Sequence, residues 1–174
     1  MQEIQKPQLW EYAPYALEYV HLVPDDGLVL RHLQDNLQAL KVLVDSLSKE
    51  KLSTPCAEGE WTIKEILVHI SDTERVFAYR ALRFARNDFT ELHGFEQDGY
   101  VVASGANERS IGDILAELTA VRIASLALFR SFKAEALERA GLSNGYKLSV
   151  RSAIYIVTGH ELHHVRSIKE NYLS

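Results

Sequence analysis

Cysteine is nearly absent from this sequence, which holds only Cys56 among 174 residues. A lone cysteine excludes an intramolecular disulfide and a zinc site built from several thiolates. This usage suits a reducing compartment. Residues 1–8 are polar and lack the apolar stretch of a signal peptide, and no apolar run approaches the ~18 residues of a membrane span. We therefore expect a cytoplasmic protein without membrane attachment.

Positive charge is also in short supply. Lysine and arginine total 19 against 24 aspartate and glutamate, for a formal net charge of -5. Nucleic-acid-binding surfaces need clustered basic residues, so nucleic acid is not an expected partner. The content of 47% hydrophobic and 25% charged residues is typical of a globular domain. A chain of this length can bury a core of its own, and we predict one domain over residues 1–174.

Helical periodicity marks four long segments, at about residues 26–49, 61–87, 110–138 and 149–172. Apolar side chains in the first recur at steps of three and four, which places them on one helical face: Leu30, Leu33, Leu37, Leu40, Val44 and Leu47. No segment shows a convincing strand pattern. Four such helices predict an all-α fold, an antiparallel four-helix bundle.

The connections between these helices differ in character. Residues 88–109 form a long crossover. An Asn-Gly pair within residues 140–148 favours a small hairpin. Residues 1–24, rich in proline and aromatic side chains, predict an N-terminal arm that packs across the bundle, with a short helix at residues 15–20.

The second helix has a recognisable start. Thr62 and Glu65 have the spacing of a capping box, in which the hydroxyl accepts the backbone N–H of residue 65 and the carboxylate accepts that of residue 62. Trp61 before the cap and Ile66 after it suit a hydrophobic staple. These signals predict that the helix begins at Thr62.

Two histidines of the last helix have the spacing of a metal site. His160 and His164 are four residues apart, a turn of ~400°, so their rings share one face and can bind one ion. His163, three residues after His160, is the alternative partner. His164 shares its face with Val157 and Ile168, and this apolar company favours it as the inward residue.

His69 is the best source of a third ligand. It follows Ile66 by three residues and precedes Thr73 by four, so it borders the inner face of the second helix. A single histidine in such a place is commonly a structural core residue. Three imidazoles clustered on inner faces would carry a desolvation cost unless something binds them, which favours a metal. Spacing alone leaves both interpretations open.

The last helix also contains an HExxH string, the zincin motif, with Glu161 as its candidate general base. Its context is poor, because Ser167 and Glu170 stand where a metzincin continues with glycine and histidine. We also expect no later helix to supply a glutamate ligand, and no sheet to hold a peptide. A protease is therefore a minor hypothesis. Glu161 is expected either to support a ligand or to pair with an arginine of a neighbouring helix.

Two motifs together resemble the DinB/YfiT-like superfamily. The segment WTIKEILVHISDTE (residues 61–74) is similar to the family pattern W-[ST]-x-x-E-x-x-x-H-x-x-D-x-E, and GHELHH (residues 159–164) resembles its last-helix signature. The helix order agrees as well. The resemblance implies a four-helix bundle of unusual connectivity, with His69, His160 and His164 as ligands and His163 nearby without ligating.

The resemblance also implies a range of functions. Members of the family bind zinc or nickel and often form homodimers, and some are S-transferases or isomerases that use low-molecular-weight thiols. Many others are called metal-dependent hydrolases without an established activity. We therefore predict a metal-dependent enzyme, a thiol S-transferase or a hydrolase, acting on a small molecule. The alternative is a non-catalytic stress protein that binds a metal or a small ligand.

Three further features are candidates for this site. Asp72, one turn from His69, either orients its ring or acts as a base, or is simply a solvated helix residue. Residues 95–100 of the crossover either cover the metal mouth or form a plain surface loop. The arginines of the second helix are expected mostly in solvent, with a contact to an anionic thiol as the alternative: Arg75, Arg80, Arg83 and Arg86.

Overall fold

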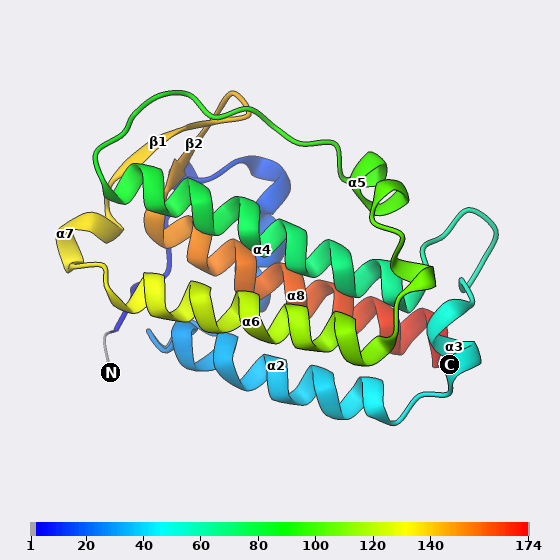
Figure 1. Ribbon diagram of the computed structural model, residues 1–174. Helices are drawn as coiled ribbons and strands as arrows, with labels where there is room; N and C mark the ends of the chain where they lie inside the picture. The colour runs from blue at the N-terminus through cyan, green and yellow to red at the C-terminus, as the bar shows by residue number, and fades with distance from the viewer. Residues whose placement is uncertain (1–2, 174) are drawn as a thin grey trace.

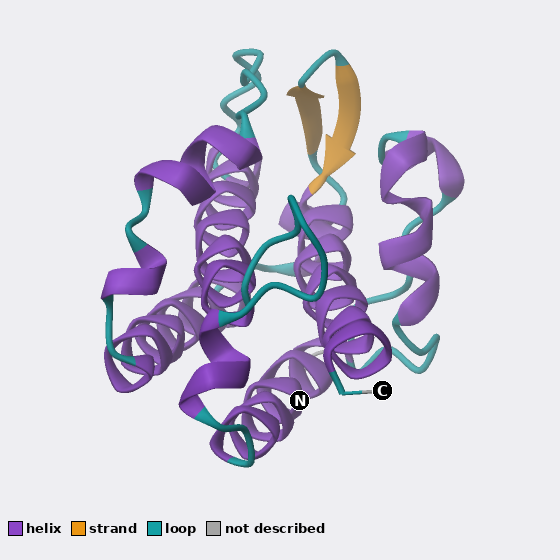
Figure 2. Ribbon diagram, turned by 90° about the vertical axis from the view of Figure 1, so that its right-hand side faces the viewer, coloured by secondary structure: helices purple, strands orange, loops and turns teal. Residues whose placement is uncertain are grey.

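Four long helices build the body of the protein in a computed structural model that describes residues 3–173 (Figure 1). They are α2 (Val29–Asp45), α4 (Ile63–Ala85), α6 (Ile111–Arg130) and α8 (Val150–Tyr172). Helices α2 and α4 lie diagonally in the bundle, since each packs against both α6 and α8. The predicted all-α four-helix bundle is confirmed, and Figure 2 shows it nearly end-on.

The long crossover sets the direction of the helices. It carries the chain back to the end at which α4 begins, so α4 and α6 run in the same direction (Figure 1). The antiparallel relationship holds for α4 with α8 and for α2 with α6. The crossover also contains two elements that the sequence did not indicate, α5 (Gln97–Ala103) and the 3-10 turn η3 (Ala106–Glu108).

Two predicted helices are shorter than expected. The first ends at Asp45, and residues 49–53 form a separate helix, α3 (Lys49–Ser53), because the Ser48 hydroxyl accepts the backbone N–H of Lys51 and starts a new one. The third ends at Arg130 and is followed by α7 (Ala134–Leu137). There the chain leaves the helical path and buries Phe132 beside Phe129.

The N-terminal arm lies against the bundle. It contains η1 (Leu9–Glu11), η2 (Pro14–Ala16) and α1 (Leu17–Leu22), so the predicted short helix is present two residues later than expected. Ile4 is buried, and its carbonyl accepts a hydrogen bond from the Tyr155 hydroxyl at 2.8 Å. Helix α1 packs along α8, the helix that carries two of the candidate ligands.

The predicted hairpin is also present. Strands β1 (Ala140–Ser143) and β2 (Tyr146–Ser149) pair antiparallel, and the two turn residues adopt positive φ as an Asn-Gly turn requires. The crossover is tied to this hairpin, since the N–H of Leu92 donates to the Leu142 carbonyl at 3.0 Å and that of Asn144 to the Leu92 carbonyl at 2.9 Å. The start of the crossover is thereby held over α4.

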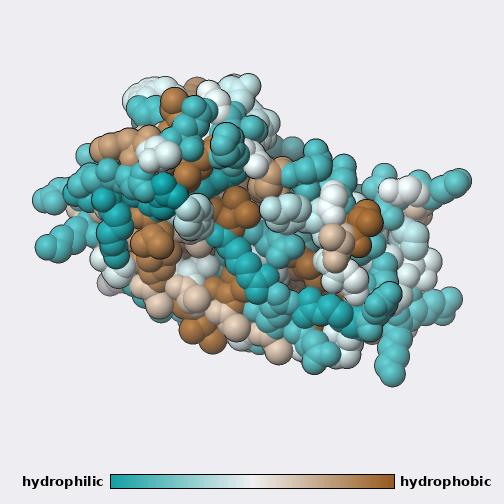
Figure 3. Space-filling view, turned by 45° about the horizontal axis from the view of Figure 1, so that its top comes forward, coloured by the Kyte–Doolittle hydropathy of each residue, from teal (hydrophilic) through white to brown (hydrophobic). Residues whose placement is uncertain are grey.

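The outer surface is mixed in character. Figure 3 shows apolar patches within a largely hydrophilic face. Trp10 of the arm is 68% exposed and Val102 of α5 is 83% exposed. Among residues 3–173, no helix is long and apolar enough to cross a membrane.

Candidate metal centre

Three histidine side chains converge between α4 and α8. His69 comes from α4, while His160 and His164 come from α8. The Nε2 atom of His160 lies 2.9 Å from Nε2 of His69 and 3.1 Å from Nε2 of His164. Potential ligand atoms of all three lie within 4.8 Å of one another. The structure thus brings together the three histidines that the sequence singled out.

The nitrogen spacing suits a single ion. Imidazole nitrogens bind zinc at ~2.0–2.1 Å, so two ligands of one ion are roughly 2.9 Å apart at a right angle and roughly 3.4 Å apart at a tetrahedral angle. The two separations at His160 fall in this range. The donor set also fits a borderline metal such as zinc or nickel, because all three donors are imidazoles.

Hydrogen bonding alone does not account for this cluster. The Nε2 atom of a neutral imidazole carries either one hydrogen or one lone pair. His160 Nε2 nevertheless faces two other Nε2 atoms at hydrogen-bond distance. One hydrogen or lone pair cannot satisfy both neighbours at full strength. A cation between the rings would satisfy all the lone pairs together.

Burial keeps the three rings neutral. It lowers the pKa of His69 to about 4, against a smaller opposing effect of the Asp98 carboxylate. Burial, with the neighbouring histidines adding to it, lowers the pKa of His164 to about 3 and that of His160 well below its usual value. Neutral imidazoles are the form that binds a metal, so the site is ready to do so at neutral pH.

The start of α4 sets the position of His69. The predicted capping box is confirmed: Thr62 N–H donates to the Glu65 carboxylate at 2.7 Å, and Glu65 N–H donates to the Thr62 hydroxyl at 3.2 Å. The Trp61 ring, just before the cap, lies 4.9 Å from the His69 ring between centroids. The same local signals that begin the helix therefore place an indole beside the candidate ligand.

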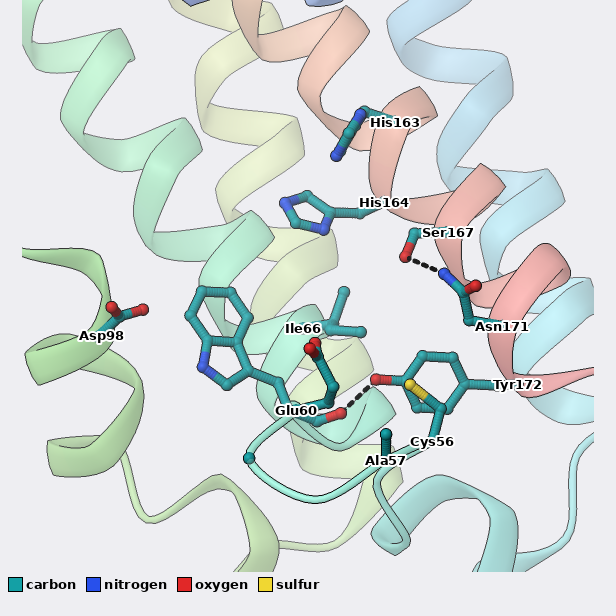
Figure 4. A pocket seen from close by; sticks show the side chains of 12 residues that line it. Cys56, Ala57, Glu60, Ile66, Asp98, His163, His164, Ser167, Asn171 and Tyr172 are labelled. Carbon is teal, nitrogen blue, oxygen red and sulfur yellow. Dashed lines mark hydrogen bonds between the residues drawn. The ribbon is translucent and has the colours of Figure 1, made fainter.

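Two cavities flank the histidine cluster. A cavity of ≈ 570 Å³ reaches His164, and its other lining residues come mainly from the end of α8 and the loop before α4 (Figure 4). A second cavity of ≈ 280 Å³ reaches His160 and is lined by the arm, α4 and the crossover. The three rings thus stand between two spaces that small molecules could enter.

The crossover contributes to both cavities. Phe95, Glu96 and Gln97 line the smaller one, whereas Asp98 lines the larger one. Figure 4 shows Asp98 on α5 and His164 on α8 at the same cavity. Residues 95–98 therefore lie beside the histidine cluster, whereas Gly99 and Tyr100 line neither cavity. The sequence did not single out Asp98, because its position depends on the path of the crossover.

His163 lies outside the cluster. Its Nδ1 atom is 3.3 Å from the Glu18 carboxylate of α1, and its ring also lines the larger cavity. Its ring centroid is 5.2 Å from that of His164. The apolar company of His164 thus identified the inward residue correctly.

Glu161 lies in the core of the bundle. Its carboxylate is 3.1 Å from the guanidinium of Arg122 on α6, and that guanidinium also binds Glu74 of α4 at 2.9 Å. All three side chains are at most 1% exposed. Burial raises the pKa of Glu161 to about 7, against the opposing effect of Arg122. The expected pairing with an arginine of a neighbouring helix is confirmed, and this arrangement turns Glu161 away from the base role of a zincin.

Asp72 belongs to a network of ion pairs on the side of α4. Its carboxylate accepts a hydrogen bond from Arg75 at 3.1 Å, and Arg75 also pairs with Glu117 of α6 at 2.6 Å. Within residues 3–173, no hydrogen bond joins Asp72 to His69, so the structure offers no contact through which Asp72 would orient that ring. Burial raises the pKa of Asp72.

Comparisons with known proteins identify the family of this chain. Residues 32–168 match the family model of the DinB superfamily, and the chain belongs to that superfamily. A protein of Oceanobacillus iheyensis is 30% identical over 80% of this chain and 81% of its own, and one of Geobacillus thermodenitrificans is 27% identical over 80% and 78%. Both are named "Putative metal-dependent hydrolase".

A solved structure supports the fold in particular. YfiT from Bacillus subtilis, described as a probable metal-dependent hydrolase with an unusual four-helix bundle topology, aligns with a TM-score of 0.76. The alignment covers 84% of this chain and 85% of YfiT at 18% sequence identity. The diagonal placement of α2 and α4 is thus part of a bundle topology that this chain has in common with YfiT.

Proposed function

We propose that the protein is a metal-dependent hydrolase that acts on a small molecule. The convergence of three Nε2 atoms, with separations of 2.9 Å and 3.1 Å at His160, carries the proposal. The names of the two relatives support it. His69, His160 and His164 would hold one divalent ion, zinc or nickel, which would lower the pKa of a bound water and supply hydroxide at neutral pH.

The chain's own residues supply the remaining functions. Three protein ligands would leave a coordination position for water or substrate. The two cavities beside the rings give a substrate access to the site. Two carboxylates line the larger cavity, Glu60 and Asp98, and we assign the role of proton acceptor to Asp98 because of its proximity to His69. Its charge already acts on His69. Cavities of ≈ 570 Å³ and ≈ 280 Å³ suit small molecules rather than extended polymers.

The first experiment measures metal content. Wild type, His69→Ala and His163→Ala are purified without an affinity tag, titrated with zinc and with nickel, and subjected to elemental analysis. We expect about one metal per chain for wild type and for His163→Ala, and a loss in His69→Ala, since a three-ligand site keeps only two donors. Equal metal in wild type and His69→Ala would refute the site and return the HExxH interpretation to consideration.

Turnover is then screened with the loaded protein. Small esters, amides and phosphoesters are presented to wild type, His69→Ala and Asp98→Asn. We expect His69→Ala to lose metal and activity together, and Asp98→Asn to keep the metal while its turnover falls, by roughly 10²-fold if it acts as a general base. Hydrolysis that is unchanged in His69→Ala would contradict a metal-dependent reaction.

A thiol S-transferase is the second candidate. The observation in its favour is the pair of cavities that meet at the histidines, since a transfer reaction needs one space for a thiol and another for an electrophile. A thiolate held near the ion would form a bond to the electrophilic carbon as the leaving group departs with its electron pair. Metal-dependent formation of a thioether from a low-molecular-weight thiol, in the absence of hydrolysis, would favour this candidate.

Non-catalytic binding is the remaining alternative. A protein that holds one metal per chain but turns over no ester, amide, phosphoester or thiol–electrophile pair faster than the free ion would be a metal- or ligand-binding protein.

The arm suggests how two copies would associate. We propose a homodimer whose contact includes the exposed Leu9 and Trp10 of the arm. Light scattering of wild type and Trp10→Ser tests this, and a monomeric wild type would rule it out.

A further inference from the structure

Arg80 is a buried cation beside the candidate metal centre. It lies on α4, is only 3% exposed, and lines the ≈ 280 Å³ cavity that also reaches His160. It lies between Phe77 and Phe84, two buried positions of the same helix face. The prediction that most arginines of this helix lie in solvent holds for Arg75 and Arg86, which are exposed, and Arg80 is the exception.

Among the described residues, no acidic side chain forms an ion pair with this guanidinium. Within residues 3–173, Arg80 forms no ion pair, and its one hydrogen bond runs from Nη2 to the His93 carbonyl at 3.0 Å. A guanidinium has five N–H donors, so most of its donor capacity is unused. Arg122 shows what the bundle does with a buried arginine that is purely structural: it gives it two carboxylates, Glu74 and Glu161.

Aromatic rings hold the guanidinium at the cavity. Its central carbon lies 4.8 Å from the ring centroid of Phe77 on α4 and 5.9 Å from that of Phe95 in the crossover. These contacts stabilise a cation in part, but they do not bind its N–H groups. They restrict the side chain, so less conformational entropy is lost when a ligand binds.

A second polar group in this cavity lacks a partner. Thr73, one of its lining residues, is 3% exposed, and its hydroxyl has no hydrogen-bond partner among the described residues. A buried hydroxyl without a partner carries a cost that a ligand atom would remove. Glu96, the carboxylate at the same cavity, is exposed, and it accepts the Asp98 N–H at 3.4 Å at the start of α5.

We propose that Arg80, with Thr73, binds an oxyanion group of the substrate, a carboxylate or a phosphate. The planar guanidinium matches both groups through paired hydrogen bonds, and burial strengthens such bonds. The rest of the substrate extends along the cavity to His160. The inference rests on the proposed function only in making the anion part of a substrate, since the anion site itself does not require the metal.

Binding to metal-free protein tests this site separately from the metal centre. Benzoate, phenyl phosphate and the neutral benzamide are titrated by calorimetry into wild type, Arg80→Met and Arg80→Lys. We expect wild type to bind one or both anions at least 10-fold more tightly than benzamide, and the methionine variant to lose this preference. Arg80→Lys should retain part of it. The two anions distinguish a carboxylate site from a phosphate site.

Two controls separate binding from folding. Arg86→Met removes an exposed arginine of the same helix and should bind the anions as wild type does. Thr73→Val keeps the side-chain volume and should weaken anion binding several-fold, so the proposal stays testable if Arg80→Met fails to fold. Equal binding of benzoate and benzamide by wild type, or anion binding that survives in Arg80→Met, would overturn the proposal. If wild type bound no metal, the proposed function would be refuted, but the anion-binding result would still stand.

Discussion

The backbone carbonyl of Tyr19 packs directly against the α-carbon of Gly159, the residue before His160. A Cβ atom built on Gly159 would lie 1.8 Å from the Tyr19 oxygen and 2.4 Å from its carbonyl carbon. Helix α1 can approach α8 this closely only because residue 159 has no side chain. The Tyr19 ring then lies 5.3 Å from the rings of both His160 and His163, so the arm forms one wall of the site.

Gly159→Ala should therefore destabilise the protein. The added methyl group meets backbone atoms that cannot rotate away, and overpacking of this kind typically destabilises a protein by roughly 1–3 kcal/mol. Urea denaturation followed by circular dichroism measures the change. Gly112→Ala is the matched control, since a Cβ there would lie 3.8 Å from the Ser110 hydroxyl in ordinary contact. That variant should be as stable as wild type or more stable, by up to about 1 kcal/mol. Equal stability of the two alanine variants would contradict the close packing of α1.

The stability of metal-free protein should fall as pH decreases from about 6.5 toward 4. The folded-state pKa of His69 is about 4 and that of His164 about 3, against an ordinary value of 6.5. Below pH 6.5 the unfolded chain binds protons that the folded state does not. The contribution of these histidines to the free energy of unfolding is therefore fully present above that pH and is lost progressively below it. His69 and His164 each contribute a loss on the order of 3 kcal/mol at pH 4.

Urea midpoints between pH 4 and 8 test this dependence. His69→Ala should show a shallower decline than wild type, whereas His21→Gln, a change at an exposed histidine of α1, should follow wild type. Saturating zinc should raise stability more at pH 7 than at pH 5, because protons and metal compete for the same nitrogens. A pH profile that is the same for His69→Ala and wild type would show that this ring is not held neutral by the fold.

Arg122→Met should be among the most destabilising single changes. It leaves Glu74 and Glu161 buried without a cation, and removal of one partner from a buried ion pair costs about 3–5 kcal/mol. Burial already raises the pKa of Glu161, and without the opposing guanidinium this carboxyl takes up a proton more readily, so the loss should be smaller at pH 5 than at pH 8. Arg130→Met, an exposed change at a residue bonded to Gln34, should stay within about 0.5 kcal/mol of wild type. A similar cost for both variants would argue against the buried triad.

Thr62→Ala should weaken the start of α4. The hydroxyl accepts the Glu65 N–H at 3.2 Å and donates to the Asn107 side chain at 2.8 Å, and loss of such a cap costs about 0.5–2 kcal/mol. Thr119→Ala is the control, because within residues 3–173 that hydroxyl bonds only to the Leu115 carbonyl one turn earlier in its own helix. Thermal unfolding compares the two. If Thr62→Ala also lowers zinc affinity, the cap helps to position His69. Equal zinc affinity of Thr62→Ala and Thr119→Ala would show that the cap does not have this role.

The local features of the fold were predictable from the sequence. Apolar spacing identified the four long helices, the capping box marked the beginning of α4, and the Asn-Gly pair marked the hairpin. Each of these depends on residues within one or two turns of each other. The same local reasoning chose His164 over His163 from its apolar neighbours, and the structure places His164 in the cluster.

The composition of the site beyond the histidines was not predictable in this way. Asp98 reaches the larger cavity because the crossover is held at the hairpin through Leu92 and then forms α5, a path set by contacts far apart in the sequence. Arg80 had a detectable signal, its place between Phe77 and Phe84 on the buried face, but its sequence neighbours Arg75, Arg83 and Arg86 made a solvated row the simpler interpretation. Whether a buried arginine has a carboxylate partner depends on which helices face it.

The sequence by itself thus determined the four long helices, the beginning of α4 and the spacing of His160 and His164, because these follow from backbone geometry and the periodicity of side chains. Only the tertiary structure decided that His69 meets them across α4 and α8, that Glu161 is directed to Arg122, and that Arg80 lies beside a cavity without an ion-pair partner among residues 3–173. Periodicity tells which face of a helix is buried. It does not tell which neighbour that face meets, since the packing order of the helices is set by the path of the crossover and by contacts between distant segments.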